Sequence, residues 1–161
     1  METIPILEEV ASTYGGYIFY KDLAQQLFER TGVHTRTQLG NWIGKPLGAV
    51  LGHCLKHDLP ALSSLVVRAE SGMVGHGFNE FLRMSGKDSI EDPLTLERVA
   101  AEERLKCYRH FGSVPFDAEP MLTREYAEKL SRSEPRPMKS QPACSSCAML
   151  LPVSGQCDYC A

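Results

Sequence analysis

Four cysteines at the C-terminal end of the sequence constrain the fold more than any other feature. Cys144, Cys147, Cys157 and Cys160 form the pattern C-x2-C-x9-C-x2-C. Each C-x-x-C pair places two thiolates on one tight turn, and two facing turns supply the tetrahedral sulfur set that zinc prefers. The segment is too short to have a hydrophobic core of its own. We therefore expect residues 143–161 to fold around a structural Zn²⁺.

Two other uses of these cysteines remain open: disulfides, which are rare in cytosolic chains, and an iron–sulfur or redox dithiol site. A zinc ion with four protein ligands has no open coordination position, so we do not expect a hydrolytic centre. The segment resembles the zinc-ribbon class. That resemblance implies a nucleic-acid or protein partner, although some ribbons only hold a terminus in place.

The remaining chain has the composition of an ordinary globular protein. Its 161 residues suffice for one well-buried domain and a small appendage. We find neither an apolar run of about 18 residues nor a secretory signal, which predicts a cytoplasmic protein without a membrane partner. The net charge of −3 gives no general affinity for polyanions. Residues 20–57, however, contain five Lys or Arg and two Asp or Glu, a net charge of +3.

Hydrophobic periodicity predicts a mainly helical α+β fold. Gly32 suits the left-handed residue that ends a helix, and Thr95 is the expected cap of a later helix. The expected helices are 4–14, 21–31, 36–43, 46–57, 79–84, 95–111 and 123–130, and the expected strands are 17–20 and a hairpin formed by 61–69 and 73–78. The predicted organisation is a body at 1–84, a helical extension at 94–131, a linker at 132–142 and the cysteine segment at 143–161.

The stretch YKDLAQQLFERTGVHTRTQLGNWIG resembles a helix-turn-helix, with 36–43 as its recognition helix, and SLVVRAESGMVGHGF resembles the wing of a winged-helix domain. The helix at 46–57 departs from that pattern, because it lies between the recognition helix and the wing. Either this longer helix docks on DNA instead, or the domain has another use. The body and the cysteine segment together also resemble uncharacterised proteins of actinobacteria and their phages.

The winged-helix resemblance implies contacts with double-stranded DNA. Side chains on or beside the third helix would read base edges in the major groove, and further cations would approach the phosphate backbone. The alternative is an ordinary solvated face. The expected DNA-binding residues are Arg36, Gln38, Asn41, Lys45, Lys21, Arg68 and His76.

The sequence contains no recognisable catalytic motif. His53 and His57 share a helical face without a nearby Glu, and His76 lacks an identified acidic partner. Glu102 and Glu103 are expected to face solvent. The leading interpretation is therefore a non-catalytic DNA-binding protein, a transcription regulator or accessory factor, with the acidic helix at 95–111 available for homodimerisation or a protein contact. The alternatives are a protein-interaction adaptor or phage-type inhibitor of a host protein, and a nuclease-like enzyme centred on His76.

Overall fold

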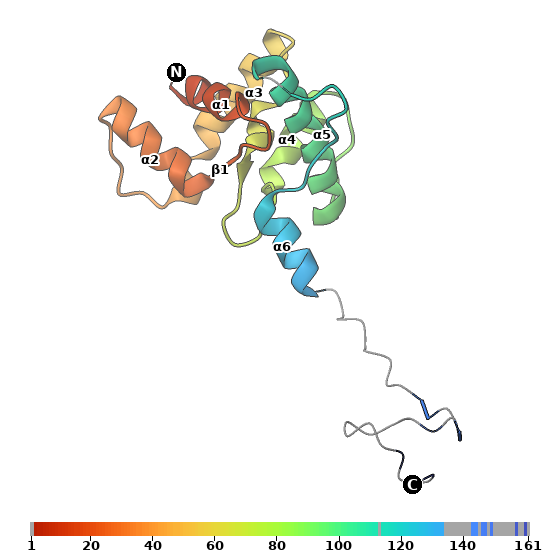
Figure 1. Ribbon diagram of the computed structural model, residues 1–161. Coiled ribbons are helices and arrows are strands. Elements are labelled where there is room, and N and C mark those ends of the chain that lie inside the picture. Colours follow the sequence, from red (N-terminus) through yellow and green to blue (C-terminus); the bar gives the residue numbers. More distant parts are fainter. Residues whose placement is uncertain are drawn as a thin grey trace. The chain divides into compact units, whose positions relative to one another are not determined.

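The computed structural model describes residues 2–112, 114–133, 143–144, 146–147, 149, 157 and 160 (Figure 1). The chain divides into two compact units, Met1–Leu130 and Ser131–Ala161, and each is described by itself. From residue 134 onward, the predicted linker lies outside the described residues.

Helices make up most of the first unit, which confirms the mainly helical prediction. The described helices and strands are α1 (Thr3–Ala11), β1 (Ile18–Phe19), α2 (Tyr20–Thr31), α3 (Gly44–Lys56), β2 (Val66–Val67), α4 (Asn79–Met84), α5 (Pro93–Phe111) and α6 (Arg124–Ser133). Three short 3₁₀ turns join them: η1 (Leu39–Asn41), η2 (Leu62–Leu65) and η3 (His76–Phe78). Gly32 ends α2 with φ 68°, as predicted.

The two strands form a small parallel pair in which Ile18 lies opposite Val66 and Phe19 opposite Val67. The predicted hairpin is reduced to a single antiparallel bridge between Val67 and Val74. The strand expected at 61–69 was wrong over its first half, which forms η2 instead. Leu62 and Leu65 are both fully buried. Their spacing of three residues puts them on the same side of a 3₁₀ turn, and an apolar run alone does not distinguish that from a strand.

Helix α5 contributes residues to two hydrophobic clusters. Cys107 and Tyr108 belong to the first cluster, together with buried residues of α1, α2, α3 and η2. Leu96 and Ala100 belong to the second, which gathers α4, the end of β2 and Leu51 of α3. One face of α5 is therefore buried in the core of the first unit.

A buried ion pair on α5 holds the loop that follows β2. The Arg104 guanidinium donates to Glu97, and their side chains are 1% and 0% exposed. Arg104 Nη1 also donates to the carbonyl of Ser64 at 3.1 Å, and the backbone N–H of Val74 donates to Glu97 Oε2 at 2.8 Å. This network fixes Val74, which directly precedes the glycine-rich segment Gly75-His76-Gly77.

Candidate metal centre and nucleic-acid interface

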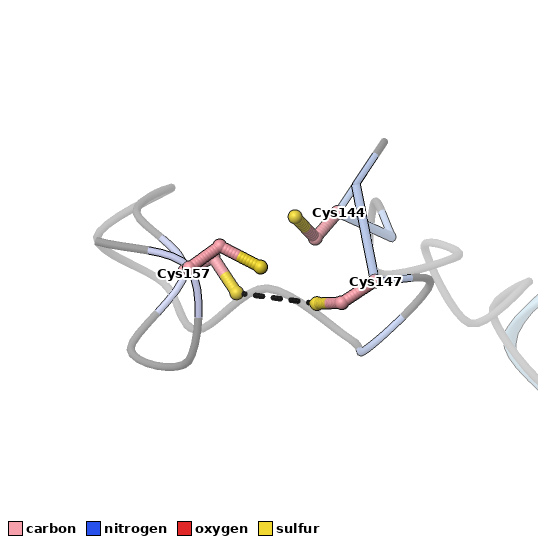
Figure 2. Close-up of side chains that lie close together, drawn as sticks. Cys144, Cys147 and Cys157 are labelled. Atoms are coloured by element: carbon pink, nitrogen blue, oxygen red, sulfur yellow. Dashed lines mark hydrogen bonds between the residues drawn. The ribbon is translucent and has the colours of Figure 1, made fainter.

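The four C-terminal thiols lie close enough together to hold one metal ion. All four Sγ atoms are within 4.8 Å of one another (Figure 2). Tetrahedral zinc with Zn–S bonds of about 2.3 Å requires sulfurs roughly 3.8 Å apart, which these positions can reach with small adjustments. The Sγ atoms of Cys147 and Cys157 are 3.5 Å apart, too far for a disulfide bond of about 2.05 Å.

The backbone around Cys144 favours its thiolate, the form that binds metal. Hydrogen bonds from the N–H groups of Ser146 and Cys147 lower the pKa of the Cys144 thiol to about 6. The Cys144 N–H itself donates to the carbonyl of Met149 at 2.8 Å. Hydrogen bonds to Cys147 and Cys157 raise the pKa of Cys160 to about 11, so the sulfurs interact strongly as a group.

The other two cysteines are packing residues. Cys54 and Cys107 are both fully buried in the first hydrophobic cluster. Burial raises the pKa of Cys107 to about 12 and raises that of Cys54 as well. Both therefore stay protonated and unreactive at neutral pH.

The prediction of a recognition helix at 36–43 was wrong. Only the 3₁₀ turn η1 forms there, and residues 32–38 are irregular. The Thr35 hydroxyl accepts a hydrogen bond from the Thr37 N–H at 3.1 Å, a local turn that competes with helix formation. Trp42 stacks on Phe28 with ring centroids 5.3 Å apart and packs against the first cluster, so it anchors this segment to the core.

Three of the seven predicted DNA-binding residues come together around one hollow. Lys21 at the start of α2, Arg68 after β2 and His76 in η3 all line a cavity of about 350 Å³, together with Ile43, the residue that precedes α3. Glu70 also lines it and opposes part of this positive charge. Three segments far apart in the sequence thus bring two cations and an imidazole to one place.

The remaining four predicted residues are not part of this hollow. Arg36 and Gln38 lie in the irregular segment, Asn41 ends η1, and Lys45 lies in the first turn of α3. All seven predicted residues are exposed. Within the described part of the chain, no salt bridge engages Lys21, Arg36, Lys45 or Arg68.

The floor of the hollow depends on close contact between Tyr20 and Gly75. A Cβ atom added at Gly75 would lie 2.7 Å from the Tyr20 hydroxyl oxygen and 3.5 Å from Arg68 Nε. Glycine is therefore needed for the loop to approach β1 and α2 this closely. Burial raises the pKa of Tyr20, although the nearby Arg68 charge acts in the opposite direction.

The structure gives His76 two polar neighbours that the sequence did not identify. Its Nδ1 lies 3.2 Å from Asn79 Nδ2, and its Nε2 lies 3.5 Å from Glu91 Oε2. Asn79 is held in turn by the backbone N–H and carbonyl of Ile90, at 2.8 and 3.0 Å. Asn79 and its bonds to Ile90 were missed because no local pattern marks a contact between a short helix and a loop eleven residues away.

The rings of His53 and His57 contact each other at a tilt of 41°, with centroids 4.4 Å apart. Among the described residues, the four-cysteine cluster is the only group of three or more potential ligands arranged for a metal ion. The histidine pair therefore lacks a third ligand in this part of the structure.

Three glycines leave part of the exposed surface of α3 without side chains. Ideal Cβ atoms at Gly44, Gly48 and Gly52 would meet nothing within 4 Å. Lys45 and Lys56 are exposed on the same helix. A ligand can thus come close to the helix backbone with positive charge on either side.

No family model matches the chain, and neither a curated protein nor a solved structure matches it. None of the described helices has the length and apolar character needed to cross a membrane.

Proposed function

We propose that this protein is a non-catalytic DNA-binding regulator or accessory factor that contacts duplex DNA through α3 and the hollow beside it. The observation that carries this proposal is the convergence of Lys21, Arg68 and His76 at the residue that precedes α3. In this proposal α3 is the helix that contacts DNA, the role that the winged-helix interpretation assigned to residues 36–43.

The chemistry of the surface suits a phosphate backbone. The N-terminus of a helix carries a partial positive charge, which favours a phosphate near Gly44, the first residue of α3. Lys21 and Arg68 add full charges, which Glu70 offsets only in part, and neither forms a salt bridge within the described residues. The glycine-lined face of α3 lets DNA approach closely, and Asn41 at the end of η1 and Lys45 in the first turn of α3 would reach base edges.

The cysteine cluster completes the proposal as a structural zinc ribbon. Its four thiols match the ligand type and number of a closed zinc site. A closed site supplies no reactive water, so zinc would hold the fold of the segment rather than perform chemistry. The ribbon would provide a second contact, either with DNA or with a protein partner.

The proposal is tested by the salt dependence of binding to duplex DNA. For about three phosphate contacts, raising salt from about 50 to about 200 mM should weaken binding roughly 40-fold. Replacing Lys21 and Arg68 together by alanine should weaken binding at low salt and reduce the slope of log affinity against log salt by about 2. Electrophoretic mobility shift titrations measure both quantities. The exposed Arg98→Ala variant is the matched control, since this residue does not line the hollow.

Two other outcomes of the same titrations would replace the proposal. If wild-type protein does not bind DNA at low salt, or if the Lys21/Arg68 variant binds normally, the interpretation as a protein-interaction adaptor is favoured. If DNA is cleaved in the presence of a divalent metal, and His76→Ala abolishes cleavage, the nuclease-like interpretation is favoured, with Glu91 as the carboxylate that orients His76.

A further inference from the structure

A second and larger hollow lies on the first unit, formed by the C-terminal ends of α3 and α4 and the last turns of α5. Its volume is about 660 Å³, within the range of about 300 to 1,000 Å³ typical of small-molecule sites. None of the predicted DNA-binding residues lines it. From its lining we propose that this hollow binds a nucleoside monophosphate, with the phosphate at its cationic edge and the base against its apolar wall.

The cationic edge carries more positive charge than its own carboxylates balance. Lys87, Lys106 and Arg109 line the hollow, opposed by Asp58 and Glu103. Arg109 lies in the last turn of α5, where a cation also complements the helix dipole. The helix dipole does not account for the other two cations, because Lys87 lies outside any helix and Lys106 lies about one turn before Arg109.

Glu103 pairs with both lysines and offsets only one of their two positive charges. Its side chain is only 6% exposed, whereas those of Lys87 and Lys106 are 55% and 57% exposed. One carboxylate oxygen, Oε1, lies 2.7 Å from Lys106 Nζ and 4.0 Å from Lys87 Nζ. A single buried negative charge thus draws two ammonium groups to one side of the hollow, and a phosphate placed between them would be held by both.

Ser85 supplies an independent indication that a ligand is held here. Its hydroxyl oxygen is buried and has no hydrogen-bond partner among the described residues, and Ser85 lines the hollow. A buried hydroxyl without a partner is unfavourable, and a rotation of the Ser85 side chain toward the hollow would let it donate to a phosphate oxygen.

The apolar residues of the hollow explain why a nucleotide fits better than a bare anion. They are Leu55, Leu59, Pro60 and Phe81. These side chains offer apolar surface to a planar base, whereas they give no favourable contact to inorganic phosphate or to a sugar phosphate. The residues that line the hollow therefore favour a ligand with one anionic and one flat apolar part.

Isothermal titration calorimetry of the full-length, zinc-loaded protein tests the proposal with four probes: adenosine 5′-monophosphate, adenosine, glucose 6-phosphate and inorganic phosphate. The nucleotide should bind at least about tenfold more tightly than each of the others, because only it engages both sides of the hollow. Lys87→Ala and Lys106→Ala should each weaken its binding about tenfold, through loss of a charged hydrogen bond. Lys129→Ala, an exposed lysine on α6, should change nothing.

Ser85→Ala separates binding from a structural role. It should weaken nucleotide binding severalfold without lowering the urea midpoint, because it removes a hydroxyl that has no partner in the described structure. A dissociation constant weaker than about 1 mM for adenosine 5′-monophosphate would overturn the proposal. So would equal affinities for the nucleotide and glucose 6-phosphate, or unchanged binding in both lysine variants.

Discussion

At the residue scale, charge alone would place Arg104 and Glu97 of α5 in solvent, yet the two side chains form a buried ion pair. Charged side chains are usually exposed, and no pattern in the sequence marks these two as core residues. Glu103 was expected to face solvent and is instead buried beside Lys106. Both carboxylates are accounted for by cations on the same helix, Arg104 seven residues after Glu97 and Lys106 three after Glu103.

We expect Arg104→Ala to lower the free energy of unfolding by about 3–5 kcal/mol, because it leaves the Glu97 charge buried without its partner. Urea denaturation of the full-length protein measures this change. Arg98→Ala removes an exposed arginine from the same helix and should change stability by less than about 0.5 kcal/mol. Equal effects of the two substitutions would show that the buried pair does not stabilise the fold in this way.

At the scale of elements, helical periodicity located most of the helices but failed where local hydrogen bonds decide the conformation. The helices predicted at 21–31 and 79–84 match α2 and α4 within one residue at each end. The segment 36–43 has apolar spacing that allows a helix, yet Thr35 and Thr37 close a local turn and Gly40 adds no helix preference. The start of α5 shows a similar failure, because its cap is Asp92 and not Thr95.

The Asp92 cap predicts a pH-dependent contribution to stability. Hydrogen bonds from the Thr95 hydroxyl and N–H lower the pKa of Asp92 in the folded state. A carboxyl group whose pKa is lowered on folding contributes stability above its unfolded pKa of about 3.9 and loses it as the pH falls through the folded value. Asp92→Ala should therefore lower the urea midpoint at neutral pH.

Asp92→Asn separates capping from titration, since asparagine caps helices about as well as aspartate but has no charge to lose. Its urea midpoint should stay near that of the wild type at neutral pH and should fall less on acidification to about pH 3. If both variants lose the same stability at neutral pH, the side chain at this position does not act as a cap.

At the scale of the whole molecule, the sequence indicated two parts, one stabilised by a hydrophobic core and the other by cysteine ligands of a metal ion. The first unit has two hydrophobic clusters of its own, all within Met1–Leu130. The second unit contains the four clustered cysteines. Cysteine spacing predicted that cluster because ligand chemistry acts over a few residues. The hollow between α3, α4 and α5 could not be predicted, since the segments that line it meet only in the folded chain.

The zinc assignment predicts one bound ion per chain. It also predicts that a substitution can disrupt the metal site without destabilising the first unit, and the reverse. Cys157→Ser should reduce zinc content, measured by inductively coupled plasma mass spectrometry, and leave the urea midpoint of the first unit unchanged. Cys54→Ala should do the opposite: it keeps the ion and lowers the free energy of unfolding by about 1–3 kcal/mol through loss of buried packing. Full zinc content in Cys157→Ser would contradict the assignment.

The glycines on the outward face of α3 imply that this protein is less stable than its fold permits. Glycine inside a helix costs about 0.5–1 kcal/mol relative to alanine, and methyl groups at positions 48 and 52 would project into open space. Gly48→Ala and Gly52→Ala should each therefore raise resistance to urea. If the same substitutions weaken association with duplex DNA, glycine at these two positions serves close contact at the expense of stability. Function rather than folding would then be the reason for these residues.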